Sequence, residues 1–138
     1  MDRVNQIWNH PLYQNELNKL QLLETDRIFC RHTPEHFLDV ARLAYIFALE
    51  RNLDCSRELI YCTALLHDIG RARQYEDGTP HDEAGAAIAG QILNELGFSM
   101  EEMEAIIAAI RGHRAQTDQT VLGKLLYTAD KRSRNCFS

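Results

Sequence analysis

Hydrophobic residues recur every three or four positions along most of this chain, which is the spacing of an amphipathic α-helix. Runs of alternating polarity rich in β-branched residues, which would indicate strands, are nearly absent. The pattern therefore predicts an all-α protein, folded as a compact bundle of about six helices.

Helix-start and helix-stop residues divide the middle of the chain. Thr33 and the proline after it form an N-cap and first-turn pair, so we expect a helix over 34–50. Ser56 is expected to cap a second helix, which Gly70 ends. Residues 71–80 are polar and contain both glycine and proline, so we expect them to form a loop.

The rest of the chain supplies the other helices. One is expected over 82–96. Ser99 and Glu102 form a capping-box pattern that opens another, and a last one includes 122–130. Residues 1–31 carry weaker signals, in which spaced leucines predict a helix packed on the outside of the bundle.

The composition fits one soluble globular domain. Of 138 residues, 45% are hydrophobic, and no linker, repeat or low-complexity stretch divides them. No apolar run approaches the roughly 20 residues that span a bilayer, and the polar N-terminus lacks the apolar centre of a secretory signal. The four cysteines include no CxxC pair, which fits reduced thiols. We therefore expect a cytoplasmic protein without membrane contacts.

Charge is distributed unevenly along the sequence. The net charge is −5, but residues 111–138 hold six basic and two acidic side chains, whereas residues 1–110 hold nine basic and 18 acidic ones. An acidic protein does not favour a nucleic-acid polymer as partner. A local basic rim fits a small phosphate-bearing ligand, and a solvated helix face is the equally simple alternative.

Several predicted helices carry potential metal ligands on their apolar faces. His36, His67 and His113 lie at the ends of such stripes, and Asp68 and Asp130 occupy similar inward positions. One histidine on an apolar face is more often a hydrogen-bonded core residue than a ligand. Several together with two carboxylates favour a metal site, because a cation offsets the cost of burying them.

These residues also resemble a known family. His36, the pair His67 and Asp68, and Asp130 occur in the order of the H…HD…D signature of the HD-domain phosphohydrolase superfamily. The string LLHDIG at 65–70 resembles the HDIG form of that signature, and EHFLDVARLA at 35–44 resembles the segment that carries the first histidine. The resemblance covers about 30–134.

The resemblance implies a single HD domain over 1–138, with a metal-binding core at 32–134. It implies one or two divalent transition-metal ions, Fe, Mn, Zn, Co or Ni, and hydrolysis by metal-bound hydroxide. By analogy His67 and Asp68 are catalytic. The first ion would be held by His36, His67, Asp68 and Asp130, and Asp68 would bridge to a second ion held by His81 and His113.

The sequence departs from many relatives after HDIG, where they have lysine and this chain has Arg71. Arginine does not act as a general acid, but its planar fork binds phosphate. We therefore assign Arg71 to catalysis and substrate binding and Arg73 to substrate binding, with Arg114 and Lys131 as weaker candidates. Plain surface solubility is the alternative for each.

Residues 32–36 also fit the H-x-x-E-H pattern of zinc peptidases, in which both histidines lie on one helix. Pro34 argues against that interpretation, because a proline in the first turn leaves His32 outside the helix. We expect His32 to be a surface residue, with a substrate contact or a hydrogen bond behind a metal ligand as alternatives.

Three functions follow from these features. The first is a phosphohydrolase acting on a phosphomonoester or phosphodiester of a nucleotide or similar small metabolite, with a homodimer as a candidate assembly. The second is a di-iron oxygenase, because a few HD-domain enzymes resemble this chain in carrying the same six ligands. The third is a non-catalytic module that senses a nucleotide or a metal.

Overall fold

The computed structural model describes residues 2–25, 32–112 and 120–133, and within these ranges it contains eight helices and no strand. In chain order they are α1 (Asp2–Trp8), α2 (Pro11–Leu23), α3 (Pro34–Glu50), α4 (Arg57–Leu66), α5 (Arg71–Asp77), α6 (His81–Glu95), α7 (Met100–Gly112) and α8 (Val121–Ser133). The prediction of an all-α bundle is confirmed. None of the described helices is both long and apolar enough to span a bilayer.

The helix starts predicted from capping residues are confirmed. The Thr33 hydroxyl accepts a hydrogen bond from the backbone N of His36 at 3.2 Å, so α3 begins at the proline after it. Ser56 caps α4 in the same way. At the start of α7, Ser99 and Glu102 each accept a hydrogen bond from the other's backbone N at 3.1 Å, which completes the capping box.

The prediction of a loop over 71–80 is wrong for its first part, because Arg71–Asp77 forms the short helix α5. Helix α4 ends at Leu66, and Gly70, with a φ of −80° and a ψ of −4°, is the N-cap from which α5 begins. Ala72 gives the helix a buried face. The left-handed residue that ends it is Gly78, with a φ of 82°.

The N-terminal segment, which the sequence pattern placed on the outside, contributes to the apolar core. Ile7, Tyr13 and Leu17 are buried in the main cluster, and the Tyr13 hydroxyl donates to the Leu65 carbonyl at 3.0 Å. The helical stripe was hard to recognise because the charged Glu16 interrupts it. That carboxylate is nonetheless 2% exposed.

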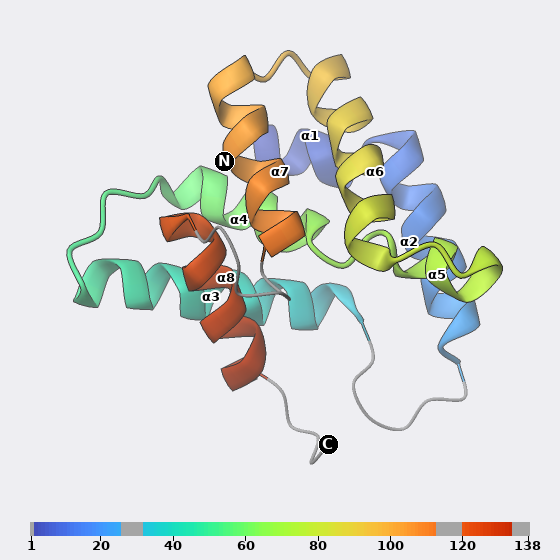
Figure 1. The fold of residues 1–138 in the computed structure, drawn as a ribbon, viewed down its shortest axis with the longest axis horizontal. Helices are drawn as coiled ribbons and strands as arrows, with labels where there is room; N and C mark the ends of the chain where they lie inside the picture. Colours follow the sequence, from blue (N-terminus) through green and yellow to red (C-terminus); the bar gives the residue numbers. More distant parts are fainter. Residues whose placement is uncertain (1, 26–31, 113–119, 134–138) are drawn as a thin grey trace.

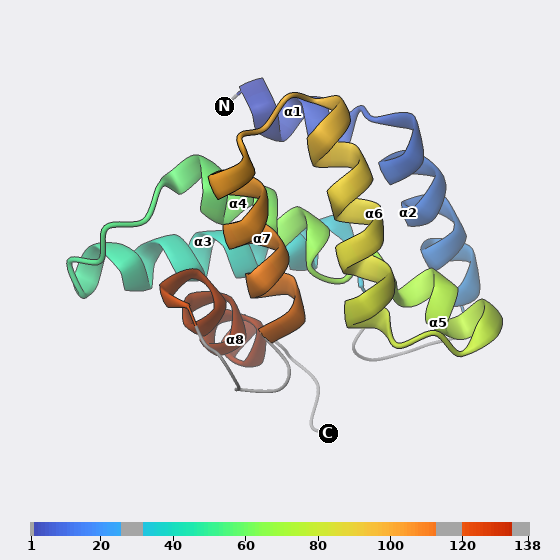
Figure 2. The same cartoon turned by 45° about the horizontal axis from the view of Figure 1, so that its top comes forward.

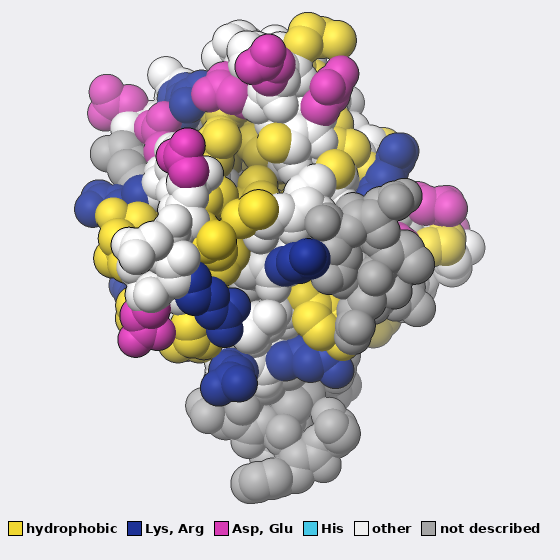
Figure 3. Space-filling view, turned by 60° about the vertical axis from the view of Figure 1, so that its left-hand side comes forward, with side chains coloured by type: hydrophobic (Ala, Val, Ile, Leu, Met, Phe, Trp, Pro, Cys, Tyr) yellow, Lys and Arg dark blue, Asp and Glu magenta, His cyan; other side chains and the backbone are white. Residues whose placement is uncertain are grey.

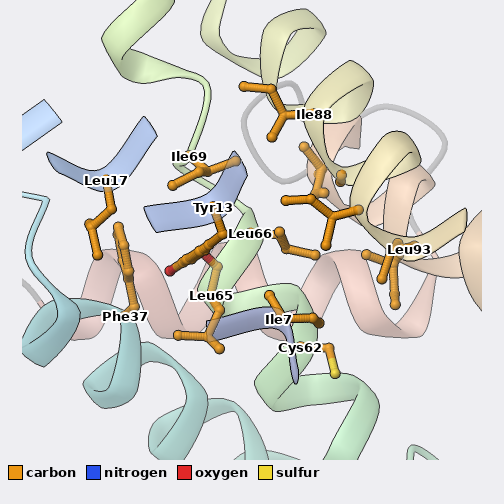
Figure 4. Packing of buried hydrophobic residues seen from close by; sticks show 14 of the residues in the cluster. Ile7, Tyr13, Leu17, Phe37, Cys62, Leu65, Leu66, Ile69, Ile88 and Leu93 are labelled. Carbon is orange, nitrogen blue, oxygen red and sulfur yellow. The ribbon is translucent and has the colours of Figure 1, made fainter. Parts of the chain in front are cut away.

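The apolar core has two parts that share α3 and α4. The first joins these helices to α1, α2, α5, α6 and α7 (Figure 4), and the second joins them to α7 and α8. Phe37 and Leu66 belong to the first part, and Val40 and Ala64 to the second. The two helices are therefore held from both sides, which fixes the ends that carry the candidate ligands.

The helices form two groups that α7 connects. Figures 1 and 2 show α3 beside α8 on one side of the bundle and α2, α5 and α6 together on the other. Helix α7 contacts both α6 and α8. On the face drawn in Figure 3, most acidic side chains lie toward the top and most basic ones lower down.

Gly70 allows α6 to approach the end of α4 closely. A Cβ at this position would lie 2.3 Å from the backbone N of Gly85 and 2.3 Å from the carbonyl oxygen of His81. Backbone atoms cannot move aside as a flexible side chain can. The absence of a side chain at Gly70 therefore sets where α6 begins relative to His67 and Asp68.

We expect Gly70→Ala to lower the free energy of unfolding by about 2 kcal/mol or more, because α6 must shift to relieve the clash. Gly90→Ala is the matched control: its Cβ would meet only Ile107 Cδ1, at 3.7 Å. That change should be neutral or stabilise by up to about 1 kcal/mol, since alanine favours helix. Urea unfolding of both variants measures this, and a Gly70→Ala protein as stable as wild type would contradict the close approach.

Candidate metal centre

Four potential metal ligands from three helical elements meet in one place. His36 lies in the first turn of α3, His67 and Asp68 follow the last turn of α4, and Asp130 lies on α8. One ligand atom from each residue lies within 4.8 Å of all the others. The shortest separations are 3.0 Å between His36 Nε2 and Asp130 Oδ1 and 3.1 Å between His67 Nε2 and Asp68 Oδ2.

Local structure orients these side chains. His67 is the C-cap of α4, and its Nδ1 donates to the carbonyl oxygen of Ala64 at 2.5 Å. With Nδ1 committed to this carbonyl, Nε2 is the ring nitrogen that faces Asp68 and Asp130 and the one that a metal would take in place of a proton. This hydrogen bond from the far ring nitrogen to a carbonyl is the usual support of a ligating histidine.

The carboxylates in this cluster are deeply buried. Asp68 is 0% exposed and Asp130 is 8% exposed. Within the described residues, Asp68 Oδ2 accepts no hydrogen bond of good geometry, although it is buried. A buried charge without full compensation is costly, and a bound cation is one way to provide it.

Electrostatic coupling in the cluster is strong. Burial alone would raise the pKa values of Asp68 and Asp130. His67 instead holds the pKa of Asp68 well below its ordinary range, and His36 and His67 together do the same for Asp130. Burial alone would lower the pKa of His67, yet the two carboxylates raise it to about 10. Without a metal, the cluster therefore holds a proton on His67 that balances part of the negative charge.

The donor set fits a divalent transition-metal ion. Two imidazoles and two carboxylates are ligands that Zn, Fe, Mn, Co and Ni accept. The buried Asp68 Oδ2 supplies an oxygen for which the described part of the chain offers no hydrogen-bond donor of good geometry. The four residues thus offer a cation both charge and ligand atoms.

Of the other two predicted ligands, the structure describes only His81. His81 is the first residue of α6 and is 3% exposed, with its Nδ1 2.9 Å from Gln74 Oε1. It does not belong to the group of four ligand atoms identified among the described residues. His113 lies outside the described residues.

Three of the four predicted substrate-binding residues are described, and they differ in what their side chains contact. Arg71 borders the cluster, because its Nε donates to Asp68 Oδ1 at 3.0 Å while its side chain stays 21% exposed. Arg73 Nε lies 3.7 Å from Glu16 Oε1 on α2. Lys131 Nζ lies 5.2 Å from the centre of the Tyr127 ring, and Arg114 lies outside the described residues.

His32 was expected at the surface, and that expectation is wrong: it is 3% exposed. Its Nδ1 lies 2.5 Å from Glu24 Oε2, and its Nε2 lies 3.9 Å from Asp68 Oδ2. No periodic pattern marks this position because it precedes α3, which begins at Pro34. The same helix start supports the argument against the zinc-peptidase pattern.

His32 and Glu24 influence each other's protonation. Burial lowers the pKa of His32, and the Glu24 carboxylate opposes that effect only in part. Burial would raise the pKa of Glu24, but hydrogen bonds from His32 and Tyr75 lower it. The pair therefore combines an ionised carboxylate with an imidazole that favours its neutral form.

Comparisons with known proteins support one family. The family model of the HD domain matches residues 33–135. An uncharacterized protein from Clostridium beijerinckii is 45% identical over all 138 residues of this chain, which cover 87% of that protein. Ribonuclease Y from Enterococcus faecalis is 30% identical over 125 residues, and the chain spans 22% of the length of that relative.

A solved structure agrees with the sequence matches. The crystal structure of a predicted HD superfamily hydrolase from an uncultured Thermotogales bacterium superimposes with a TM-score of 0.66 at 30% identity. The match covers 86% of this chain and 66% of that one. Because the family model spans most of the chain and the fold agrees, this protein belongs to the HD domain family.

Proposed function

We propose that this chain is a metal-dependent phosphohydrolase that cleaves a phosphomonoester or phosphodiester of a nucleotide or a similar small metabolite. The observation that carries the proposal is the buried cluster of His36, His67, Asp68 and Asp130. A divalent cation, when bound, supplies Lewis acidity and an activated water for phosphate-ester hydrolysis. Membership in the HD domain family supports the hydrolytic chemistry.

Two groups of residues have separate roles in the proposed reaction. The four clustered ligands would hold the cation, and Arg71 contributes positive charge at the edge of the site. Its Nε donates to Asp68 Oδ1, and its partly exposed guanidinium keeps donors for a phosphate. Arg71 thereby couples the position of the substrate phosphate to the position of Asp68.

The substrate class rests on charge and similarity. The net charge of −5 disfavours a long polyanion, whereas the basic residues gathered in 111–138 suit a small anionic substrate. The similarity to ribonuclease Y makes RNA the second substrate class to test. We further propose a cytoplasmic location, which suits the reduced cysteines Cys55 and Cys62.

Asp68→Asn should abolish hydrolysis and reduce bound metal, because the amide cannot supply the anionic oxygen that the cation needs. We expect at least a loss of about a hundredfold in kcat/KM. Metal content by mass spectrometry and a screen of aryl phosphates, nucleotides and short RNA with Mn, Co, Ni, Fe and Zn measure this. Asp39→Asn, an exposed acid on α3, is the matched control. Equal metal and activity in the two variants would refute the site assignment.

Arg71→Lys should raise KM about tenfold with a smaller change in kcat, because lysine keeps the charge but loses the planar fork that binds phosphate. Steady-state kinetics on the best substrate of the screen measures the split. Arg42→Lys, an exposed arginine that pairs with Asp39, should behave as wild type. An unchanged KM in Arg71→Lys would remove Arg71 from substrate binding.

Metal affinity should rise with pH through the neutral range. The pKa of His67 is about 10 in the metal-free cluster, so binding below that pH must displace a proton. Each displaced proton makes the apparent log affinity rise by about one for each pH unit. Co²⁺ titrations at pH 6.5, 7.5 and 8.5, with calorimetry in two buffers of different ionisation enthalpy, measure the slope and the released proton. A pH-independent affinity would contradict the protonated cluster.

A further inference from the structure

We propose that His32 is an additional metal ligand, whose Nε2 binds a cation shared with Asp68, and that Glu24 and Tyr75 hold the imidazole in this orientation. The inference rests on the metal binding proposed above and extends the donor set of that site. It assigns a function to two buried residues, His32 and Glu24, that precede the part of the chain matched by the HD family model, 33–135.

The burial of His32 calls for a partner at each ring nitrogen. The residue is 3% exposed, although it lies before the first turn of α3 rather than in a helix. Nδ1 is satisfied by Glu24, whereas Nε2 has no hydrogen-bond partner among the residues that the structure describes. Buried polar atoms in proteins are nearly always paired, so an orphaned ring nitrogen points to a missing ligand.

Glu24 determines which ring nitrogen of His32 is available to a metal ion. One oxygen of its carboxylate accepts from the backbone N of His32 at 2.8 Å, and the other lies 2.5 Å from Nδ1. The Tyr75 hydroxyl of α5 donates to this second oxygen at 2.8 Å. A proton held on Nδ1 by a carboxylate leaves the lone pair on Nε2, which is the usual arrangement behind a metal-bound histidine.

The distance to Asp68 fits a shared ion. His32 Nε2 lies 3.9 Å from Asp68 Oδ2, which is too long for a hydrogen bond. Two ligands that each lie about 2.1 Å from one cation are separated by at most about 4.2 Å. Within the described residues, Oδ2 also lacks a hydrogen bond of good geometry. Two buried atoms without such partners in the described ranges therefore lie at a separation that one ion can bridge.

The position of His32 complements the four-residue cluster. Its ring centre lies 6.2 Å from that of His36, so the two imidazoles are neighbours without stacking. His32 is outside the group of four and reaches it through Asp68. Asp68 is the residue that the sequence analysis predicted to bridge two ions, and His32 adds a nitrogen ligand at that bridge.

The test compares metal binding in wild type and His32→Gln. Glutamine can still donate to Glu24 but is a poor ligand for Co²⁺. We expect at least a tenfold weaker Co²⁺ affinity or the loss of one bound ion, measured by equilibrium dialysis with mass spectrometry. A changed visible absorption spectrum of bound Co²⁺ should accompany it, because a nitrogen ligand is lost.

His10→Asn is the matched control, because His10 accepts from the backbone N of Leu12 at the start of α2 and asparagine can cap the helix in its place. Glu24→Gln keeps the His32 imidazole and should weaken Co²⁺ binding about tenfold, so it gives a result even if His32→Gln does not fold. Circular dichroism of the metal-free variants separates misfolding from a lost ligand.

The outcomes distinguish this inference from the proposed function. Wild-type Co²⁺ affinity, stoichiometry and spectrum in both folded variants, His32→Gln and Glu24→Gln, would overturn the role of His32 while leaving the four-residue site intact. A changed KM with unchanged metal binding would also overturn it and would make His32 a substrate contact. Wild-type protein that takes up no metal would contradict the proposed function itself.

Discussion

The burial of two carboxylates among imidazoles, where three helical elements meet, is the constraint on which this structure depends. Asp68 is fully buried and Asp130 nearly so, and each is charged because histidines compensate it. The contact of His36 Nε2 with Asp130 Oδ1 at 3.0 Å also joins α3 to α8. The groups that can bind a cation therefore hold the helices together, and a cation that replaces the proton on His67 would strengthen the same junction.

The HDIG segment positions more than its two ligands. The glycine at its end lets the backbone of α6 approach within the space that a side chain would fill. His81 begins α6 at this contact, and its backbone N and ring both meet Gln74 of α5. The distance between His81 and the pair His67 and Asp68 is thus determined largely by backbone packing. The four residues 67–70 thus position both the ligand pair after α4 and the start of α6.

Features with local causes were predictable from the sequence, and features that depend on distant partners were not. Capping residues such as Ser56 act within one turn, so the helix starts followed directly. The clustering of the four ligands was expected from their apolar surroundings and from the family resemblance. Helix α5 was missed because a glycine followed by polar residues is typical of a loop, whereas here Gly70 is the N-cap of α5, whose Ala72 is buried. His32 was missed because its contacts, Glu24 and Asp68, lie eight and 36 residues away and leave no periodic pattern.

The N-terminal segment belongs to the chemistry of this protein as well as to its core. Glu24 at the end of α2 contacts His32 and Tyr75 of α5, His32 Nε2 lies 3.9 Å from Asp68 Oδ2, and α2 precedes the region that the HD family model matches. Helices outside the shared core can therefore alter the donor set without changing the HD signature. A third imidazole beside Asp68 makes that set richer in nitrogen, which favours borderline ions such as Zn, Fe, Co and Ni over Mg²⁺. Metal preference in this chain would then depend on how α2 packs, a property that the four signature residues alone do not determine.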